Sequence, residues 1–227
     1  MAKKQDKTEG GIVAVEEALS KTERFIEENQ KLLTIIIGAI VVVVLVFFGF
    51  KRFYMAPKEQ EAKEQMFMAE RYFETDSLQL ALNGDGMYPG FLDIIDDYGM
   101  TKGANLSKYY AGISYLRLGN FEEAIDYLKS FKGKDHILGP MAKGAIGDAY
   151  MELNETSKAA GYYLDAADLK ENEFSTPLFL MKAGMAYEIM KDYDKALSVY
   201  ERIKFKFPTS QEAREIDKYI ARAKGMK

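Results

Sequence analysis

The pattern of apolar and polar positions along the chain is dominated by one long apolar run. Residues 32–50 read LLTIIIGAIVVVVLVFFGF and contain no charged side chain. As an α-helix, a run of this length reaches about 28 Å, which is close to the thickness of a bilayer core. A buried core element is the alternative, but an isolated run this long is more typical of a membrane span. We therefore predict a transmembrane helix over residues 32–50.

The residues around this run indicate a retained anchor. The preceding segment is 31 residues long and mixed in charge, and FGFKRFYMAPK after the run offers no small-x-small cleavage site. Residues 1–31 are predicted to form a cytoplasmic tail whose second half, Ala14–Lys31, is an amphipathic helix. That helix either lies on the membrane surface or is a short juxtamembrane helix that touches nothing. Within 15 residues of the run, three basic residues precede it and four follow it, so charge alone leaves the orientation open.

Beyond the span, helical periodicity continues almost without interruption. Residues 51–65 are predicted to be a juxtamembrane helical linker, with Pro57 in the first turn of a helix over Lys58–Phe73. Residues 66–227 are predicted to form one long helical domain after this linker. A glycine- and proline-rich loop, Asn83–Gly90, interrupts its first part.

A spaced pattern of small and aromatic residues recurs within that domain. The pattern Gly-x-x-Tyr-x8-Ala occurs three times in phase, and its glycines are 35 and 37 residues apart. Repeats of this period are the signature of stacked supersecondary units. Small residues mark where two antiparallel helices approach closely, and the tyrosine is expected to fill the wedge between them. The predicted repeat-packing residues are Gly112, Tyr115, Ala124, Gly147, Tyr150, Ala159, Gly184, Tyr187 and Ala196.

The flanks of these repeats are atypical, as the ends of such arrays are. Met66–Gly99 is predicted to be a degenerate first repeat, since Tyr72 and Ala81 keep the nine-residue offset. At the other end, Thr209-x-x-Glu212 predicts a capping box for a final helix. That helix would turn Ala213, Ile216, Ile220 and Ala223 inward and close the array with a polar outer face.

The repeats resemble the tetratricopeptide family. In that pattern a small-Gly-x-x-Tyr in the first helix of a repeat (helix A) is followed by Ala and an aromatic in the second (helix B), then by proline. The last repeat shows all of these residues, and the resemblance covers Asn105–Lys227, although the first two clear repeats lack the final proline. The resemblance implies an all-α protein in which a transmembrane helix precedes an α-solenoid of about three clear repeats, one degenerate repeat and a capping helix. The residues that match in the last repeat are Ala183, Gly184, Tyr187, Ala196, Tyr200 and Pro208.

The resemblance also predicts a partner-binding groove along helix A of each repeat. Nine of the twelve expected groove positions are apolar and four of these are methionine, which suits apolar partners of varied sequence. The alternative is that Lys58–Phe73 or the final helix fills the groove. Substituting Met181→Lys together with Met185→Lys is expected to leave the fold intact and to abolish partner capture. The apolar groove positions are Leu106, Tyr109, Ile113, Leu116, Met141, Met151, Leu178, Met181 and Met185, and the other three are Gly144, Asp148 and Glu188.

Several function classes find no support in the sequence. The net charge of −4 argues against a nucleic-acid partner. The chain has no cysteine and a single histidine, His136, so thiolate or histidine metal clusters are excluded. No phosphate-binding loop, catalytic triad or carboxylate pair in a credible cleft is visible. We expect neither an enzyme, nor a cofactor, nor a metal site.

The order of the parts supports a closer resemblance. Glu23–Asn29 (ERFIEEN) approaches the apolar run, and Gly49–Tyr54 (GFKRFY) follows it before the repeats begin. This arrangement resembles the YfgM-type ancillary subunits of the bacterial SecYEG translocon. The resemblance implies a bacterial inner-membrane protein with its N-terminus in the cytoplasm and its repeats in the periplasm. It implies partners in SecYEG and in a membrane-anchored, PpiD-like prolyl-isomerase-type chaperone.

Two functions from different classes stay open at this point. One is an accessory to protein export that binds a periplasmic chaperone or emerging client chains through the Met-rich groove. The other is a structural scaffold for cell-envelope or division machinery, without client contact. A cytoplasm-facing receptor of inverted topology is a third and weaker hypothesis.

Overall fold

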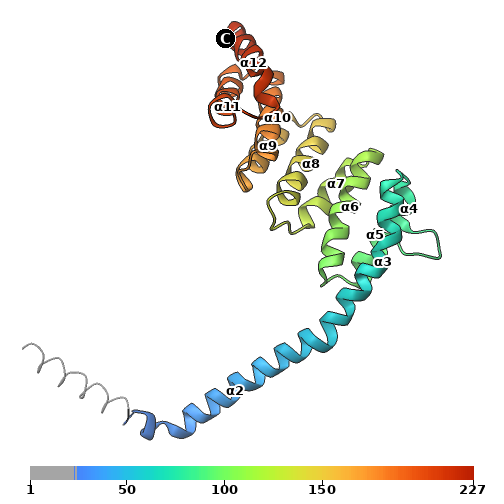
Figure 1. Ribbon diagram of the computed structural model, residues 1–227, viewed down its shortest axis with the longest axis vertical. Helices are drawn as coiled ribbons and strands as arrows, with labels where there is room; N and C mark the ends of the chain where they lie inside the picture. The colour runs from blue at the N-terminus through green and yellow to red at the C-terminus, as the bar shows by residue number, and fades with distance from the viewer. Residues whose placement is uncertain (1–22, 24) are drawn as a thin grey trace, which may run out of the picture. The chain divides into compact units, whose positions relative to one another are not determined.

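The computed structural model describes residue 23 and residues 25–227, and it divides the chain into two compact units (Figure 1). One unit ends at Pro57 and the other is Lys58–Lys227. All regular secondary structure in the described residues is helical. Most of the cytoplasmic tail and of the amphipathic helix predicted over residues 14–31 lies outside the described residues.

The first unit contains one long apolar helix. Helix α2 (Gln30–Gly49) includes all but the last residue of the predicted span, is long and apolar enough to cross a membrane, and buries none of its residues. A π-helical stretch, η1 (Phe50–Met55), follows it. Pro57 comes two residues later and cannot donate a backbone hydrogen bond to the preceding turn. A widened turn is therefore found where regular α-helical hydrogen bonding is interrupted.

The second unit is a series of helices in which each packs on its neighbours in the chain (Figure 1). Three hairpins, α6/α7, α8/α9 and α10/α11, correspond to the three clear repeats, and the all-α repeat architecture predicted from the sequence is confirmed. The helices are α3 (Ala56–Glu74), α4 (Leu78–Asn83), α5 (Phe91–Asp97), α6 (Lys102–Leu118), α7 (Phe121–Ser130), α8 (Leu138–Glu152), α9 (Thr156–Leu169), α10 (Ser175–Ile189), α11 (Tyr193–Lys206), η2 (Glu212–Glu215) and α12 (Ile216–Met226).

The repeat glycines lie where the two helices of each hairpin approach most closely. In every hairpin a helix B residue sixteen positions after the glycine occupies the space that a side chain would need. A Cβ atom built on Gly112 would lie 2.5 Å from Leu128 Cγ. The corresponding distances to Cε1 are 2.6 Å for Gly147 and Tyr163, and 2.2 Å for Gly184 and Tyr200. The predicted alanines 124, 159 and 196 are completely buried, but the residue that faces the glycine is this larger neighbour.

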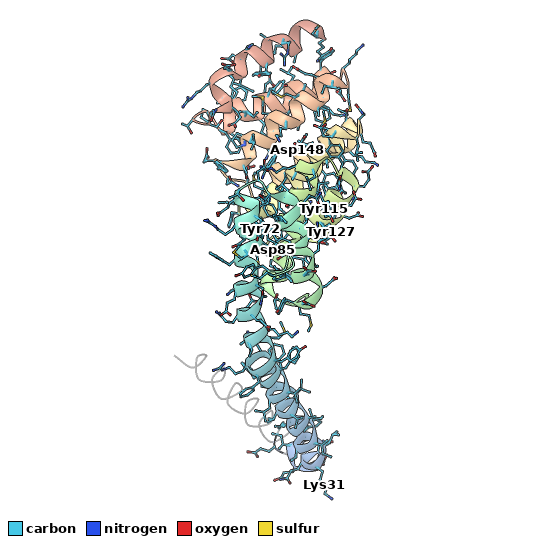
Figure 2. All side chains as sticks on the ribbon, turned by 90° about the vertical axis from the view of Figure 1, so that its right-hand side faces the viewer. Lys31, Tyr72, Asp85, Tyr115, Tyr127 and Asp148 are labelled. Carbon is cyan, nitrogen blue, oxygen red and sulfur yellow. The ribbon has the colours of Figure 1, made fainter. Side chains whose placement is uncertain are left out.

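The repeat tyrosines contact side chains of the following helix, by ring stacking in two hairpins and by a cation–π contact in the third. The rings of Tyr115 and Tyr127 are stacked with centroids 5.4 Å apart, and both residues are labelled in Figure 2. Tyr150 and Tyr162 repeat this pair at 5.3 Å. In the third hairpin Lys195 lies over the Tyr187 ring at 5.4 Å, as Lys158 lies over Tyr150 at 5.1 Å. Aromatic and cation–π contacts thus fix the angle at which each hairpin closes.

The turn within each hairpin has the same backbone hydrogen-bond pattern. Gly119, Asn154 and Lys191 adopt positive φ values of 83°, 60° and 61°. The N–H of each following residue donates to the carbonyl of the repeat tyrosine, as in Asn120 to Tyr115 at 2.9 Å. This is a Schellman cap, which ends helix A and reverses the chain within two or three residues.

The degenerate first repeat has a divided second helix. Helix α3 is its helix A, and α4 with α5 together replace helix B on either side of the loop 84–90. Their buried side chains form a second core cluster with α6. Ala62 is completely buried, and a Cβ atom built on Gly103 would lie 3.0 Å from its methyl group. We therefore propose that the repeat domain begins at Lys58, inside the linker predicted over residues 51–65.

Asp85 organises the loop that divides this helix. Its carboxylate accepts hydrogen bonds from the Tyr72 hydroxyl at 2.7 Å and from the N–H groups of Tyr88 and Met87 at 2.7 and 2.9 Å (Figure 2). These donors, with the Tyr72 hydroxyl first, hold the pKa of Asp85 below its ordinary value. The same hydrogen bond raises the pKa of Tyr72.

We expect this loop to loosen in acid. Because the folded-state pKa is depressed, the carboxylate stabilises the loop above its unfolded pKa of about 3.9, and this contribution is lost as the pH falls through the folded value. The protection factors of the Met87 and Tyr88 amides in hydrogen exchange should therefore fall between neutral and strongly acidic pH. Asp85→Asn, which keeps an acceptor but does not titrate, should make them independent of pH. A wild-type loop whose protection is unchanged in acid would show that the carboxylate does not organise it.

The C-terminal cap differs in detail from the predicted capping box. The side chain that accepts from the helix start is Ser210, whose Oγ receives the N–H of Ala213 at 3.1 Å, and not Thr209. A short 3₁₀ turn, η2, then leads into α12. Ile216, Ile220 and Ala223 are buried as predicted, while Ala213 is half-buried.

Candidate partner-binding surface

The nine apolar groove positions lie along α6, α8 and α10, which are the first helices of the three hairpins. Seven of them are half-buried and contact neighbouring core clusters. Met181 is 9% exposed and Met185 is 38% exposed. The structure thus brings these residues together as a partly covered apolar strip, and Met185 is its most accessible member.

Met181 is covered by the C-terminal segment. It lies at the base of an open cleft of about 350 Å³ whose other walls come from η2 and α12, including Glu212 and Tyr219. The expectation that lysine at position 181 leaves the fold intact is therefore revised, because a lysine there would have to displace this segment or bury its ammonium group. Helix α3, the other expected occupant of the groove, is instead the first helix of the degenerate repeat.

A second cleft lies between the first two clear repeats. It has a volume of about 580 Å³ and is lined by Leu116 and Met151 together with Phe121 and Asp148. Asp148, labelled in Figure 2, is one of the acidic groove positions. Its carboxylate accepts the Tyr163 hydroxyl at 2.6 Å and the Lys182 ammonium at 2.7 and 2.8 Å.

These contacts neutralise Asp148 within the protein. Lys182 reaches it from the next repeat and also lies over the Tyr163 ring at 5.6 Å. Burial, followed by the hydrogen bond to Asp148, raises the pKa of Tyr163, so its hydroxyl stays a donor. The charge of this groove position is consequently matched inside the molecule and does not require a basic partner.

Glu188, the other acidic groove position, is matched in the same way. Arg222 of α12 donates from Nε at 3.1 Å and from Nη2 at 2.5 Å to its two carboxylate oxygens. A bidentate pair of this geometry is strong and directional. Both acidic positions are therefore paired with a residue 34 positions later in the chain.

The remaining groove position, Gly144, is occupied by a neighbouring helix. A Cβ atom built on Gly144 would lie 1.9 Å from Phe179 Cε1, and Phe179 is 2% exposed. Gly144 therefore serves the packing of α8 against α10, and it is not open to a partner. Neither this contact nor the two charge pairs is predicted above, although in all three cases the partners lie about one repeat apart in the sequence.

The described residues contain no group of three or more His, Asp or Glu side chains placed to hold a metal ion. His136 lies in the α7–α8 connection and is exposed. What the surface offers chemically is apolar contact area edged by internally paired charges, which suits a protein or peptide ligand.

Comparison with known proteins gives the family of the repeats. Residues 109–176 and 145–211 both match the tetratricopeptide repeat family. No curated protein sequence matches the chain.

Solved structures agree with the fold. Two crystal structures of nearly identical TPR-like repeats, assigned to a kinesin light chain of Podosopora anserina and one of them a point variant, superpose with a TM-score of 0.56. Each is 14% identical in sequence, and the match covers 74% of this chain and 87% of theirs. At this identity the likeness concerns the fold alone. With the three stacked hairpins and the family match over residues 109–211, it shows that the chain carries a TPR-like α-solenoid.

Proposed function

We propose that this protein is a membrane-anchored interaction protein that binds a protein partner through the strip along α6, α8 and α10. Tetratricopeptide repeats are protein-interaction modules, and α2 supplies the anchor. The observation that carries the proposal is that the strip keeps accessible apolar area while Asp148 and Glu188 are paired internally with Lys182 and Arg222. Recognition then rests on apolar contact, and the flexible methionines suit partners of varied sequence.

The resemblance of the N-terminal segments extends this proposal to a cellular role. In it, the protein is an accessory of the Sec translocon in the bacterial inner membrane, with the N-terminus in the cytoplasm and the repeats in the periplasm. Its partners are SecYEG, along α2, and a PpiD-like membrane-anchored chaperone or emerging client chains, along the strip. What supports this role is the order of the parts: ERFIEEN, the apolar run, GFKRFY and then the repeats.

One observation favours the scaffold function. The C-terminal segment covers Met181 and places Arg222 on Glu188, so the end of the strip nearest the C-terminus is closed. A closed end shortens the surface available to a long extended client. A scaffold could bind through other faces of the solenoid and leave the strip unused.

Site-specific photocrosslinking in native membranes tests these functions. A photoreactive residue would replace Met185 in one variant and Val43, which is exposed on α2, in another. Ser157, exposed at the start of α9, provides a matched control position away from the strip. Adducts would be identified by mass spectrometry.

We expect translocon subunits at position 43 and a periplasmic chaperone or nascent chains at position 185, with neither at position 157. Division or outer-envelope proteins at positions 43 and 185, without translocon subunits, would overturn the export role and support the scaffold. Equal capture at positions 185 and 157 would show that the strip has no special part in binding.

A further inference from the structure

The connections between successive repeats form one edge of the second unit, which we call the loop edge. It consists of the α5–α6 connection (98–101), the α7–α8 connection (131–137) and the α9–α10 connection (170–174). The Asn105 side chain bonds to both the N–H and the carbonyl of Lys132, at 2.9 and 3.4 Å. Asn172 Nδ2 donates to the carbonyl of His136 at 3.2 Å. These bonds join the second turn of α6, the α7–α8 connection and the α9–α10 connection side by side.

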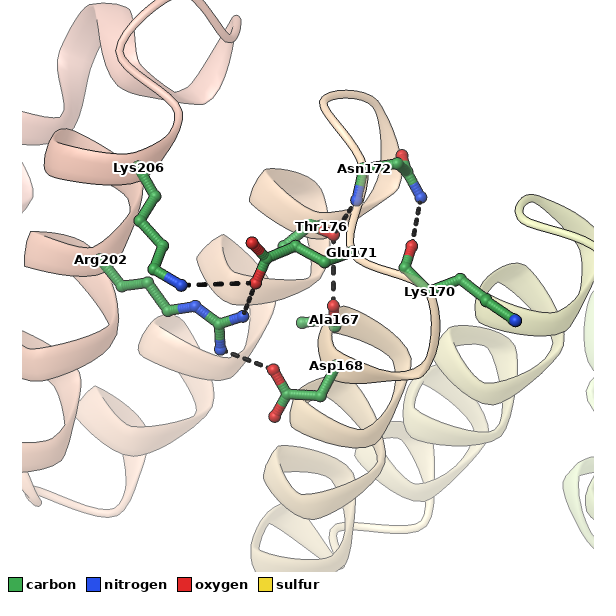
Figure 3. Close-up of polar contacts among 8 residues, drawn as sticks. All are labelled: Ala167, Asp168, Lys170, Glu171, Asn172, Thr176, Arg202 and Lys206. Carbon is green, nitrogen blue, oxygen red and sulfur yellow. Dashed lines mark hydrogen bonds and ion pairs between the residues drawn. The ribbon is translucent and has the colours of Figure 1, made fainter. Parts of the chain in front are cut away.

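The α9–α10 connection is held firmly (Figure 3). Asn172 Oδ1 accepts from the N–H groups of Phe174 and Ser175 at 2.9 and 2.7 Å. The backbone N–H of Asn172 donates to Thr176 Oγ1 at 2.9 Å. Arg202 bridges Asp168 and Glu171 at 2.6 and 2.7 Å. The side chains of this loop are therefore presented on a fixed backbone.

Each connection of the loop edge exposes one large apolar side chain. Met100 is 68% exposed, Ile137 is 55% exposed and Phe174 is 69% exposed. By contrast, the turns on the opposite edge carry Gly119, Asn120, Asn154, Glu155, Lys191 and Asp192, none of which is apolar. One exposed apolar group on each of the three adjoining connections makes this edge a candidate interaction surface.

Lysines accompany these apolar side chains. Lys102, Lys108, Lys132 and Lys134 line a cleft of about 760 Å³ whose floor includes Leu106 and Phe131. Within the part of the chain that the structure describes, none of these four ammonium groups forms an ion pair.

The carboxylates near this cleft do not pair with its four lysines. Asp135, the one carboxylate of the cleft, is engaged by the N–H groups of Ile137 and Leu138 at 2.8 and 2.5 Å. Asp97, at the end of α5, and Glu173, in the α9–α10 connection, are exposed and do not line the cleft. The edge therefore presents cationic heads above apolar groups, in a protein whose net charge is −4.

The chain also enters the second unit at this edge. Lys58 Nζ donates to the carbonyl of Asp97 at 3.3 Å, and Glu59 accepts the N–H of Lys102 at 2.7 Å. Seven residues, 51–57, lie between Phe50, the end of the apolar run, and Lys58. At the maximum reach of a polypeptide, the eight steps from Phe50 to Lys58 span at most about 28 Å. Covalent connection alone thus keeps Lys58, and with it the start of the loop edge, within about 28 Å of the end of the apolar run.

We propose that the loop edge docks on the bilayer surface by binding anionic phospholipid headgroups. Lys102, Lys132 and Lys134 contact the headgroup phosphates, and Ile137 and Phe174 enter the interfacial layer. Lysine and large apolar side chains together are the composition of protein surfaces that lie in the membrane interface. The inference rests on the proposed membrane anchor, and it adds a fixed orientation of the repeats over the lipid.

The absence of cysteine from the chain makes a direct test possible. Single cysteines at positions 136, 157 and 43 would each carry a fluorophore, in the full chain reconstituted into vesicles. His136 is exposed on the loop edge, Ser157 is exposed away from it, and Val43 lies in α2. Quenching by nitroxide-labelled phospholipid would be measured in vesicles of phosphatidylcholine, alone or mixed with phosphatidylglycerol.

We expect the label at position 136 to be quenched in vesicles that contain phosphatidylglycerol, and the label at position 157 to be much less affected. Lys132→Glu with Lys134→Glu should lower the ratio of docked to undocked protein by roughly 10- to 30-fold or more. The matched variant Lys191→Glu with Lys218→Glu makes the same change in net charge elsewhere and should leave the ratio unchanged. A higher salt concentration should also lower the ratio of docked to undocked protein, because salt screens the attraction between the lysines and the headgroup phosphates.

The outcomes separate this inference from the anchor. If the label at position 43 is quenched, and the label at position 136 is quenched no more than the control label at position 157, the docking is overturned and the anchor stands. Absence of quenching at position 43 would remove the anchor, and the inference with it. Equal quenching at position 136 in phosphatidylcholine alone would overturn headgroup recognition. A response of that label to added polyglutamate, and not to lipid, would show that the cleft takes an acidic protein segment instead.

Discussion

Replacing Gly144 with alanine is expected to lower the free energy of unfolding of the repeat unit by about 2–3 kcal/mol, the usual cost of overpacking a dense core. The added Cβ atom would lie 1.9 Å from Phe179 Cε1, closer than any real contact allows. Phe179 is 2% exposed and has no free space to move into, so α8 and α10 would have to separate. Urea unfolding of the full chain in detergent, followed by circular dichroism, measures the change as a lower midpoint with an unchanged slope.

Gly161→Ala is the matched control for this substitution. Gly161 lies in α9, and a Cβ atom there would have no neighbour within 4 Å. Alanine at an open helical site should stabilise the protein by about 0.5–1 kcal/mol, because glycine loses more backbone entropy on folding. If Gly144→Ala proved as mild as Gly161→Ala, the close approach of the two helices at this point would be wrong.

Replacing Met181 with lysine is expected to destabilise the C-terminal part of the solenoid by about 2–4 kcal/mol, since it removes a buried apolar side chain and introduces a charge. Met181 is 9% exposed and lies beneath η2 and α12. The lysine side chain would have to push this segment away to reach water. Thermal unfolding and limited proteolysis of the segment after Pro208 would both report its release.

Met185→Lys separates folding from binding. Met185 is 38% exposed, so a lysine there reaches water and should change stability by less than about 0.5 kcal/mol. Partner crosslinking along the strip should nevertheless fall, because a charge would interrupt its most accessible apolar position. Equal stability of the two variants would show that the C-terminal segment does not cover Met181. Undiminished crosslinking in folded Met185→Lys would remove position 185 from the binding surface.

The sequence by itself determined the elements whose causes are local. An uncharged run of the length of 32–50 has few structural solutions other than a long apolar helix. The spacing of Gly112, Tyr115 and Ala124 occurs twice more and indicates a helical hairpin. The glycine lets the two helices of the hairpin approach closely at one fixed place in each repeat. Gly119–Asn120 and its equivalents then fix where each hairpin turns. These signals lie within about 20 residues of one another, so pattern reasoning can find them.

Only the tertiary structure decided which surfaces stay accessible. Asp148 meets Lys182, Glu188 meets Arg222, and Asp168 meets Arg202, in each case across 34 residues of sequence. Each pair forms because the angle at which one hairpin stacks on the next brings the two side chains into contact, and that angle results from many core contacts together.

The stacking of the hairpins also places the C-terminal segment over Met181. It brings Lys102, Lys132 and Lys134 together around one cleft at the loop edge. Read along the sequence, these lysines are scattered surface charges and Met181 is one more groove residue. Their surroundings follow from long-range stacking, in which each contact depends on where all the preceding helices lie. Because of that dependence, the accessible part of the binding surface could not be predicted from the sequence. The fold could be predicted, because its signals are local.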